Sequence, residues 1–518
     1  MTNIEPLSLQ KYLWPVLFMS VLLTMAIAPL WVTDIPPLLD YHNHLARQYI
    51  LQRLESSETL SQFYTSAWPA TPYLAFDGIV QALSGYMPVA WAGKVFLAAM
   101  FLLLALAPVA LNLSLYGRIT PLALAGLLFL HNETVSAGFV NYLFGLGFAL
   151  CLFALWIKLR QASLSLRLIL FPVLCALLFF SHLLGFMIYL LCVGSYELGR
   201  HFAGLRGGPW RTFLTLHVDQ RWNLLSLVLQ ALPPLVIFTL YGPSTDTVTS
   251  NTYGGLERKF TFLHGLFEYL IPPYLWSLDR FLIIALPAAL LLLIVLRVLS
   301  LPRALHWPLG AMLVFFFAMP MELFSGWGAD HRLLPALGLL LIGALGPGPA
   351  WNRFYEHTIA LVLLILVAVR ATAVTFDWQR SNEYYAEYRR AFDHVPDGSR
   401  LFFAFGHSGG KSFKPYPVYH LPHLVLATKD VYVPFLFASP PGGGFTLQYQ
   451  PSVEPLQDLS PGPVLLNGVS PAWERLLSAY DHFLLINPQH FDRPVPVDLR
   501  LVFAGDTVML YRREPTTN

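Results

Sequence analysis

The fold is decided at residues 34–51, where the chain reads Asp34-Ile-Pro-Pro-Leu-Leu-Asp-Tyr-His-Asn-His-Leu-Ala-Arg-Gln-Tyr-Ile-Leu51. An apolar segment long enough to cross a bilayer, Tyr12–Thr33, ends immediately before it. Pro36 and Pro37 cannot continue a helix, so the chain must turn as it leaves the membrane. This order predicts a membrane helix, a turn at the membrane surface, and a second helix that carries polar residues.

The second helix is predicted over residues 41–55, with Asp40 as its N-cap. Asp40, His44 and Arg47 are spaced i, i+4 and i+7, which places them on one face of that helix. His42 points to another side. An acid, a histidine and an arginine on one face indicate a functional site, although capping alone would explain Asp40 equally well.

The composition is that of a membrane protein. Of the 518 residues, 56% are hydrophobic and only 12% are charged, whereas soluble proteins carry about 25% charged residues. The net charge of +2 gives no indication of nucleic-acid binding. The three cysteines all lie in apolar stretches, so the sequence predicts neither a disulfide framework nor a cysteine metal site.

Apolar segments of spanning length recur up to about residue 375. The run Leu168–Leu198 is too long for one span and is interrupted at Ser181-His182, which predicts two helices that meet there. The other candidates are Tyr12–Thr33, Val89–Leu113, Phe139–Ile157, Trp222–Tyr241, Phe281–Val298, Pro308–Leu323 and Thr358–Val374, with shorter ones at Ile119–Leu130 and Leu333–Leu345. Together they predict about eleven transmembrane helices.

The charges of the loops predict the orientation. With the N-terminus in the cytoplasm, cationic residues collect in the inner loops, as the positive-inside rule requires. The segment Arg200–Arg221, with four arginines, is the clearest case. Without the break at His182, Arg297 and Arg303 would move to the outside. We therefore expect a multi-pass protein of the cell inner membrane whose C-terminus, after an odd number of spans, is periplasmic.

A small soluble α/β domain is predicted over residues 376–518, on the outer face, after a transmembrane domain over residues 1–375. Strands are expected at Leu401–Phe405, Val464–Leu466, Phe483–Ile486 and Leu499–Tyr511, the last as a hairpin turning at Gly505-Asp506, and helices at Asn382–Phe392 and Pro471–Tyr480. Two outer segments, Tyr73–Tyr86 and Gly242–Asp279, are expected to form amphipathic helices along the membrane surface.

Ionisable residues gather at the outer ends of the predicted helices. Such groups are costly at membrane depth and by default mark sites. Three outer loops each carry an acid, and two of them pair it with histidine and arginine, which favours one shared site. The candidate site residues are Asp40, His44, Arg47, Lys94, Glu133, Arg258, Asp330, His331 and Arg332.

Several of these residues also have a purely structural explanation. Glu133 could be a solvated loop acid, and the long side chains of Lys94 and Arg332 could reach toward lipid headgroups. His42 and His44 are two positions apart and do not share a helical face, so they are weak candidates for a metal-binding pair.

Three motifs resemble those of the GT-C superfamily of integral-membrane glycosyltransferases, in particular the branch of protein mannosyltransferase-like and lipid A aminoarabinose transferase-like bacterial enzymes. Asp40 follows the first span, the second outer loop carries His131-Asn132-Glu133, and Asp330-His-Arg-Leu-Leu-Pro335 opens a late helix, similar to the Arg-hydrophobic-hydrophobic-Pro string of that branch. The predicted topology fits along the whole chain. Many relatives have paired acids in the first loop, whereas here Asp40 precedes two histidines, which leaves open the catalytic base and the need for a metal.

The resemblance implies transfer of a sugar from a polyprenyl-phosphate donor to a lipid, glycan or protein acceptor on the outer face, without a nucleotide site. Asp40 would be the general base, with His44 orienting it or relaying the proton. Arg332 would bind the departing phosphate. The further substrate-binding residues would be Arg47, Lys94, Glu133, Arg258, Asp330 and His331.

No cofactor is certain, but the resemblance leaves room for a divalent metal ion, Mg or Mn. Its candidate ligands are Asp40, His42 and Glu133. Membrane lipids are expected partners, and nucleic acid is not.

Two other classes of function remain open. A transporter or flippase of lipid-linked glycans would need polar residues at the membrane midplane and on both faces, whereas the predicted spans are nearly free of charge and the polar residues gather on one side. A membrane acyltransferase or glycan polymerase could also use an outer histidine or arginine. Transfer of radiolabel from an acyl donor, rather than from a sugar donor, would identify an acyltransferase.

Overall fold

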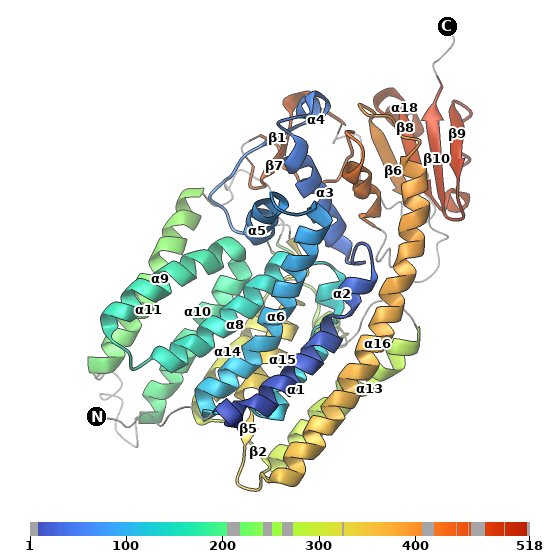
Figure 1. The fold of residues 1–518 in the computed structure, drawn as a ribbon. Coiled ribbons are helices and arrows are strands. Elements are labelled where there is room, and N and C mark those ends of the chain that lie inside the picture. Colours follow the sequence, from blue (N-terminus) through green and yellow to red (C-terminus); the bar gives the residue numbers. More distant parts are fainter. Residues whose placement is uncertain are drawn as a thin grey trace.

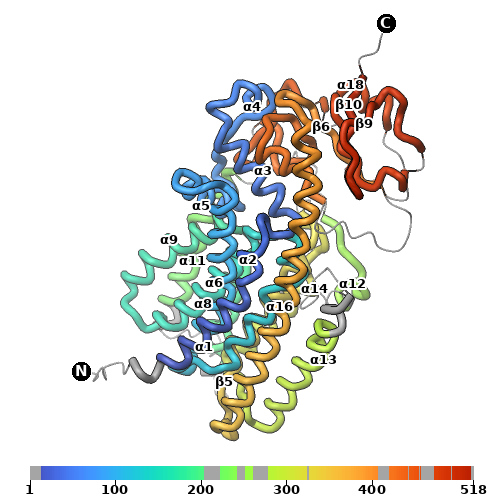
Figure 2. Tube along the Cα trace, turned by 45° about the vertical axis from the view of Figure 1, so that its right-hand side comes forward, coloured from blue at the N-terminus to red at the C-terminus, as the bar shows by residue number. Residues whose placement is uncertain are grey.

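The computed structural model describes residues 9–204, 218–241, 251–261, 273–323, 326–406, 419–441, 443–453, 455–456, 472–491 and 493–514. A bundle of long helices forms one part, and a smaller part with a sheet and short helices sits on one end of it (Figure 1). Figure 2 shows the same two parts from another side, with the sheet region joined to the bundle by the long helix α16.

Within the described ranges, eight helical segments are long and apolar enough to cross a membrane. They belong to α1 (Leu9–Ile27) with α2 (Pro29–Val32), α6 (Val89–Tyr116), α8 (Val140–Leu159), α9 (Leu164–Ser181), α10 (Leu183–Gly204), α11 (Val218–Tyr241), α13 (Pro273–Val295) and α16 (Arg353–Phe392).

Three further apolar segments are shorter than a span normally requires. They are α14 (Arg303–Ala318), α15 (Leu333–Ala344) and the buried 3₁₀ helix η1 (Pro121–Phe129). The helix predicted over Pro308–Leu323 thus begins and ends five residues earlier, because its last residues form a short hairpin strand instead. Eleven spans would require that all three of these short segments also cross the membrane, so the count of about eleven stays a prediction.

The predicted break at Ser181-His182 is confirmed. α9 ends at Ser181, the backbone of His182 is extended (φ −167°, ψ 129°), and α10 begins at Leu183. The Nδ1 atom of His182 accepts a hydrogen bond from the N–H of Leu184 (3.1 Å). This bond satisfies one of the backbone donors that the start of a helix leaves unpaired, which matters most at membrane depth.

α16 is one uninterrupted helix of 40 residues. At 1.5 Å per residue it is about 60 Å long, roughly twice the thickness of a bilayer core. Its second half therefore rises out of the bundle to the sheet (Figure 1). The predicted boundary at residue 376 falls inside this helix, and the separate helix predicted at Asn382–Phe392 is its last part, because neither glycine nor proline interrupts residues 353–392.

The sheet beside the end of α16 has four strands in the order β6-β8-β10-β9. Their bounds are β6 (Leu401–Phe405), β8 (His482–Ile486), β9 (Leu499–Ala504) and β10 (Val508–Arg513). β6 and β8 are parallel and the other pairs antiparallel. These strands, the turn at Gly505-Asp506 and the helix α18 (Trp473–Ala479) confirm the predicted elements. The strand predicted at Val464–Leu466 lies outside the described residues.

Shorter elements connect the long helices and extend from both ends of the bundle (Figure 1). They are α3 (Leu39–Arg53), α4 (Glu58–Phe63), β1 (Tyr64–Ser66), α5 (Ala75–Ser84), α7 (Glu133–Ser136), α12 (Leu256–Thr261), β2 (Leu299–Ser300), β3 (Glu322–Leu323), β4 (Gly326–Trp327), β5 (Gly346–Pro347), η4 (Leu421–Ala427), β7 (Leu447–Tyr449), η5 (Pro451–Val453) and η7 (Pro488–His490). β7 pairs with β1 and η4 packs on α3, so the C-terminal part covers the first outer helices.

Candidate functional site

Asp40 lies in the first turn of α3, and its prediction as the N-cap is wrong. The N-cap is Leu38, whose N–H bonds to the carbonyl of Pro36 (2.8 Å), so the helix starts directly after the proline turn. The N–H of Asp40 donates to the carbonyl of Ala137 (3.1 Å). Gly138 (φ +77°) allows this approach, since a Cβ there would lie 2.6 Å from the Asp40 nitrogen. The Asp40 carboxylate is therefore not used to cap the helix.

The Asp40 side chain faces residues from two distant parts of the chain. The Nε2 atom of His420 is 3.6 Å from its Oδ1. Tyr419 and Arg332 lie within electrostatic reach of the same carboxylate. Burial raises the pKa of Asp40 to about 7, and the opposing effect of the Arg332 cation is smaller. A carboxyl group with a pKa near neutral can exchange a proton under physiological conditions.

Arg332 precedes α15 and is held by aromatic rings. Its guanidinium carbon lies 4.0 Å from the centre of the Phe139 ring and 5.9 Å from that of Tyr142. One guanidinium nitrogen donates to the carbonyl of Trp327 (3.0 Å), and the Tyr142 hydroxyl donates to the carbonyl of Arg332 itself. The Nε of Arg332 is buried and has no hydrogen-bond partner among the described residues. The cation is thus fixed in place with a donor available for an anion.

Aromatic residues and a histidine extend the surroundings of Arg332. Tyr73 and Tyr142 both lie within its electrostatic reach. Their rings contact that of His182, at centroid distances of 4.7 and 5.3 Å. The helix break at His182 therefore brings a third ring to the group around Arg332.

A second group of cations surrounds His331. Burial, followed by the nearby charges of Arg258, Lys259 and Arg332, lowers the pKa of His331 to about 3. Lys259 is neutralised by Asp330, with its Nζ 3.3 Å from Oδ2, and it also donates to the carbonyls of residues 316 and 319. The guanidinium carbon of Arg258 is 5.9 Å from the ring centre of Trp327, the residue whose carbonyl accepts a hydrogen bond from Arg332.

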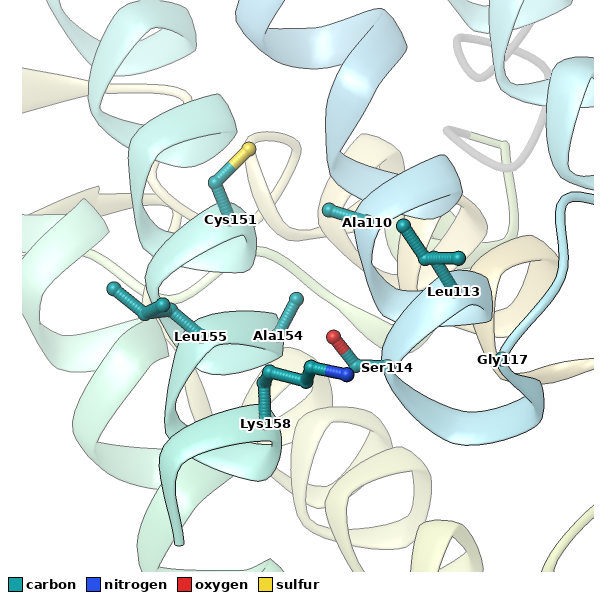
Figure 3. A pocket seen from close by; sticks show the side chains of 8 residues that line it. All are labelled: Ala110, Leu113, Ser114, Gly117, Cys151, Ala154, Leu155 and Lys158. Atoms are coloured by element: carbon teal, nitrogen blue, oxygen red, sulfur yellow. The ribbon is translucent and has the colours of Figure 1, made fainter. Parts of the chain in front are cut away.

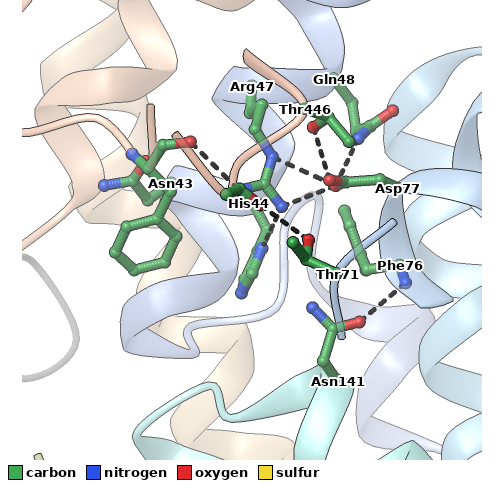
Figure 4. A network of polar contacts seen from close by, with 11 residues as sticks. Asn43, His44, Arg47, Gln48, Thr71, Phe76, Asp77, Asn141 and Thr446 are labelled. Carbon is green, nitrogen blue, oxygen red and sulfur yellow. Dashed lines mark hydrogen bonds and ion pairs between the residues drawn. The ribbon is translucent and has the colours of Figure 1, made fainter. Parts of the chain in front are cut away.

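Arg47 belongs to a different, buried network (Figure 4). Its Nε and one terminal nitrogen donate to Oδ1 of Asp77, at 3.1 and 2.6 Å. Gln48 (2.8 Å) and Thr446 (2.6 Å) also donate to the Asp77 carboxylate. A terminal nitrogen of Arg47 lies 3.1 Å from Nδ1 of His44. The face predicted to unite Asp40, His44 and Arg47 is therefore divided, with the latter two turned toward α5.

Breaking this network should destabilise the protein. Arg47→Ala leaves the Asp77 carboxylate buried without its cation, which we expect to cost about 3–5 kcal/mol. Thermal unfolding of the purified protein in detergent measures the loss. Arg389→Ala is the matched control, because the Arg389–Asp34 pair (2.5 Å) is more than half exposed and should contribute less than about 1 kcal/mol. Normal stability of Arg47→Ala, with weaker substrate binding, would instead support the predicted binding role of Arg47.

The other residues predicted for the site are Lys94, Glu133 and His42, and each has different neighbours in the structure. Nζ of Lys94 donates to the carbonyl of Thr33 (2.6 Å) and so ties α6 to the end of α2. Glu133 is half-buried in the first turn of α7, the short helix whose C-cap Ala137 accepts the N–H of Asp40. Nε2 of His42 lies 2.5 Å from the Tyr385 hydroxyl on α16. Among the described residues no group of three His, Cys, Asp or Glu side chains could hold a metal ion, so Asp40, His42 and Glu133 do not form one.

Sequence reasoning missed Asp77, Tyr419 and His420. Asp77 is the single charged residue of α5, which gave no sign of its partner. The nearest signal for His420 was its spacing of i, i+3 from His423, which places two imidazoles on one helical face. Nothing in that spacing indicates which distant residue the histidines meet.

A cavity of about 530 Å³ lies elsewhere, between α6 and α8 near their C-terminal ends (Figure 3). Its lining is mostly apolar, with Ser114 and Lys158 as polar exceptions. Asp40 and Gly138 lie near the opposite ends of these helices, so the cavity is separate from the residues around Asp40.

A scan against models of protein families found no match, and a search of curated proteins found no significant one. Among solved structures, the chain resembles ArnT from Cupriavidus metallidurans bound to undecaprenyl phosphate, with a TM-score of 0.52, 13% identity, and coverage of 96% of this chain and 98% of that one. The same protein in the apo state gives a TM-score of 0.52, 14% identity and coverage of 96% and 97%. This likeness confirms the predicted fold class, a mostly helical architecture like that of ArnT with a small C-terminal sheet region.

Proposed function

We propose that this protein is a glycosyltransferase of the cell inner membrane that moves a sugar from a polyprenyl-phosphate donor to an acceptor on the periplasmic face. The observation that carries the proposal is the placement of Asp40 within electrostatic reach of Arg332, with no ion pair joining them among the described residues. A base and a cation separated in this way can act on opposite sides of a sugar. The fold shared with ArnT, whose structure holds undecaprenyl phosphate, supports a lipid-linked donor.

In this reaction the ionised Asp40 takes the proton from an acceptor hydroxyl. The acceptor oxygen forms a bond to the anomeric carbon of the sugar as the bond from that carbon to the phosphate oxygen breaks. The polyprenyl phosphate leaves with the electron pair, and Arg332 stabilises the negative charge that develops on it. Arg258, which with Arg332 lies within electrostatic reach of His331, would bind the rest of the phosphate.

The same arrangement indicates on which side of the site the acceptor and the lipid donor would bind. Asp40 and Glu133 lie on neighbouring elements, α3 and α7, and mark the acceptor side. The rings of Phe139, Tyr142 and Tyr73 surround Arg332 and mark the donor side, where an apolar lipid chain enters. With the N-terminus in the cytoplasm, this site faces the periplasm.

The test is transfer of label from donor lipids in liposomes that contain the purified protein. We expect radiolabelled sugar to leave undecaprenyl phosphate and appear in an acceptor from a lipid or glycan extract. Label from an acyl donor supplied in parallel should stay in place. Movement of the intact lipid-linked sugar across the bilayer without cleavage would indicate a flippase, and label transferred from the acyl donor would indicate an acyltransferase. Either result would overturn the proposal.

A further inference from the structure

His420 brings the C-terminal part of the chain into contact with Asp40. It lies at the start of η4, which packs on α3, and its imidazole is buried. Its Nε2 is 3.6 Å from Oδ1 of Asp40. This separation is slightly too long for a hydrogen bond, but such contacts are often loose in unliganded sites and shorten when substrate binds.

Asn43 determines which nitrogen of His420 carries the proton. Oδ1 of Asn43 accepts the N–H of Phe437 (2.7 Å), so its amide nitrogen must be the donor. That nitrogen lies 2.8 Å from the carbonyl of Phe435 and 3.3 Å from Nδ1 of His420. Nδ1 of His420 is therefore an acceptor, and the proton of the neutral ring sits on Nε2.

We propose that His420 is a positioning residue for Asp40, whose carboxylate it orients and keeps ionised by donating its Nε2–H. This inference rests on the proposed role of Asp40 as the base. It makes the C-terminal part of the chain a component of the site, because Asn43 on α3 and the backbone at residues 435–437 together fix the ring of His420. A hydrogen bond donated to a carboxylate favours its charged form.

The neighbouring groups are compatible with this role. The charged and titratable groups that face Asp40 are Arg332, Tyr419 and His420, with Glu133 on the adjacent helix α7. Besides Asp40, those that face His420 are Tyr419, whose ring centre is 4.7 Å away, and the imidazoles of His42, His44 and His423. Burial and these three imidazoles lower the pKa of His420, so the ring stays neutral at physiological pH and remains a donor through Nε2 only.

The experiment follows the ionisation of Asp40 by carbodiimide labelling of the full-length protein between pH 5 and 9, with the modified peptide quantified by mass spectrometry. Carbodiimides react with protonated carboxyl groups, so labelling of Asp40 should fall as pH rises through its pKa. His420→Phe removes the donor and should move the midpoint up by about one pH unit. His420→Gln retains an N–H donor and should restore a midpoint close to that of the wild type.

His423→Gln is the control for damage to the fold, because the ring nitrogens of His423 face the backbone carbonyls of His420 and Pro434 (3.1 and 3.0 Å) rather than Asp40. It should lower thermal stability and leave the labelling midpoint unchanged. In the transfer assay, His420→Phe should lose about fivefold in rate at pH 7 and recover at pH 9, since a one-unit rise in the pKa reduces the ionised fraction only near and below it.

An unchanged midpoint in His420→Phe would overturn the inference, as would an equal shift in His423→Gln. The labelling requires no sugar donor. It therefore tests His420 even if the wild-type protein transfers no sugar from polyprenyl phosphate, a result that would count against the proposed function instead.

Discussion

Replacing Asp40 with asparagine should lower the rate of sugar transfer by about 10²- to 10⁴-fold, because the amide has the shape of the carboxylate but cannot accept a proton. The fold should survive this change. The side chain of Asp40 is 21% exposed and caps no helix, and its backbone N–H still reaches the carbonyl of Ala137. Transfer from a polyprenyl-phosphate sugar, measured together with thermal unfolding, separates the loss of the base from loss of the fold.

The pH dependence provides a second measure of the same residue. Only the ionised carboxylate can take the proton, and burial raises the pKa of Asp40 to about 7. The wild-type rate should therefore rise as the pH increases through about 7, and the residual rate of Asp40→Asn should lack this rise. Asp34→Asn is the control, because Asp34 is exposed and pairs with Arg389 at the surface. A wild-type rate in Asp40→Asn would remove Asp40 from the role of base.

Replacing Arg332 with glutamine should lower kcat by about 10²- to 10³-fold, the effect expected when a group that stabilises developing charge is lost. Arg332→Lys should recover only part of the rate. Lysine keeps the charge but lacks the planar guanidinium that lies against the Phe139 ring. Measurement of kcat and KM for the lipid donor tests this expectation. Arg53→Gln serves as the control, because Arg53 pairs with Asp430 (3.2 Å) near the surface.

Arg332 should also affect the titration of Asp40. Its cation lowers the pKa of that carboxyl group, so Arg332→Gln should raise the pKa above 7 and move the rise in rate to higher pH. A change in thermal stability with normal kcat and an unchanged pH profile would mean that Arg332 only packs between aromatic rings.

The membrane helices could be predicted well because they are determined locally. A segment in lipid must satisfy its own backbone hydrogen bonds and must be apolar for most of its length, and both requirements appear in the sequence. The break at His182 was recognisable for the same reason, since a polar pair interrupts a run too long for one helix. The strands near the C-terminus were also local, because β6 and β8 are buried apolar runs and β9 and β10 turn at Gly505-Asp506.

α16 shows where a local interpretation of helix bounds failed, because the helix predicted at Asn382–Phe392 is the last part of a longer one. The composition changes near residue 376 from apolar to mixed, and we predicted a domain boundary there. The helix continues because no residue interrupts it, and what changes is its surroundings, from the helix bundle to the sheet region (Figure 1). Composition reports the environment of a helix, whereas residues 353–392 contain no glycine or proline that would favour a helix end there.

The topology predicted from the sequence was enough to place Asp40 and Arg332 at the same end of the helix bundle, since both follow from where spans end. The partners of the charged groups were decided by the tertiary structure alone. Arg47 meets Asp77, Lys259 meets Asp330 and His420 meets Asp40 across contacts that no periodicity records. Hydropathy depends on each segment separately, whereas an ion pair depends on where two remote segments come together in the folded chain.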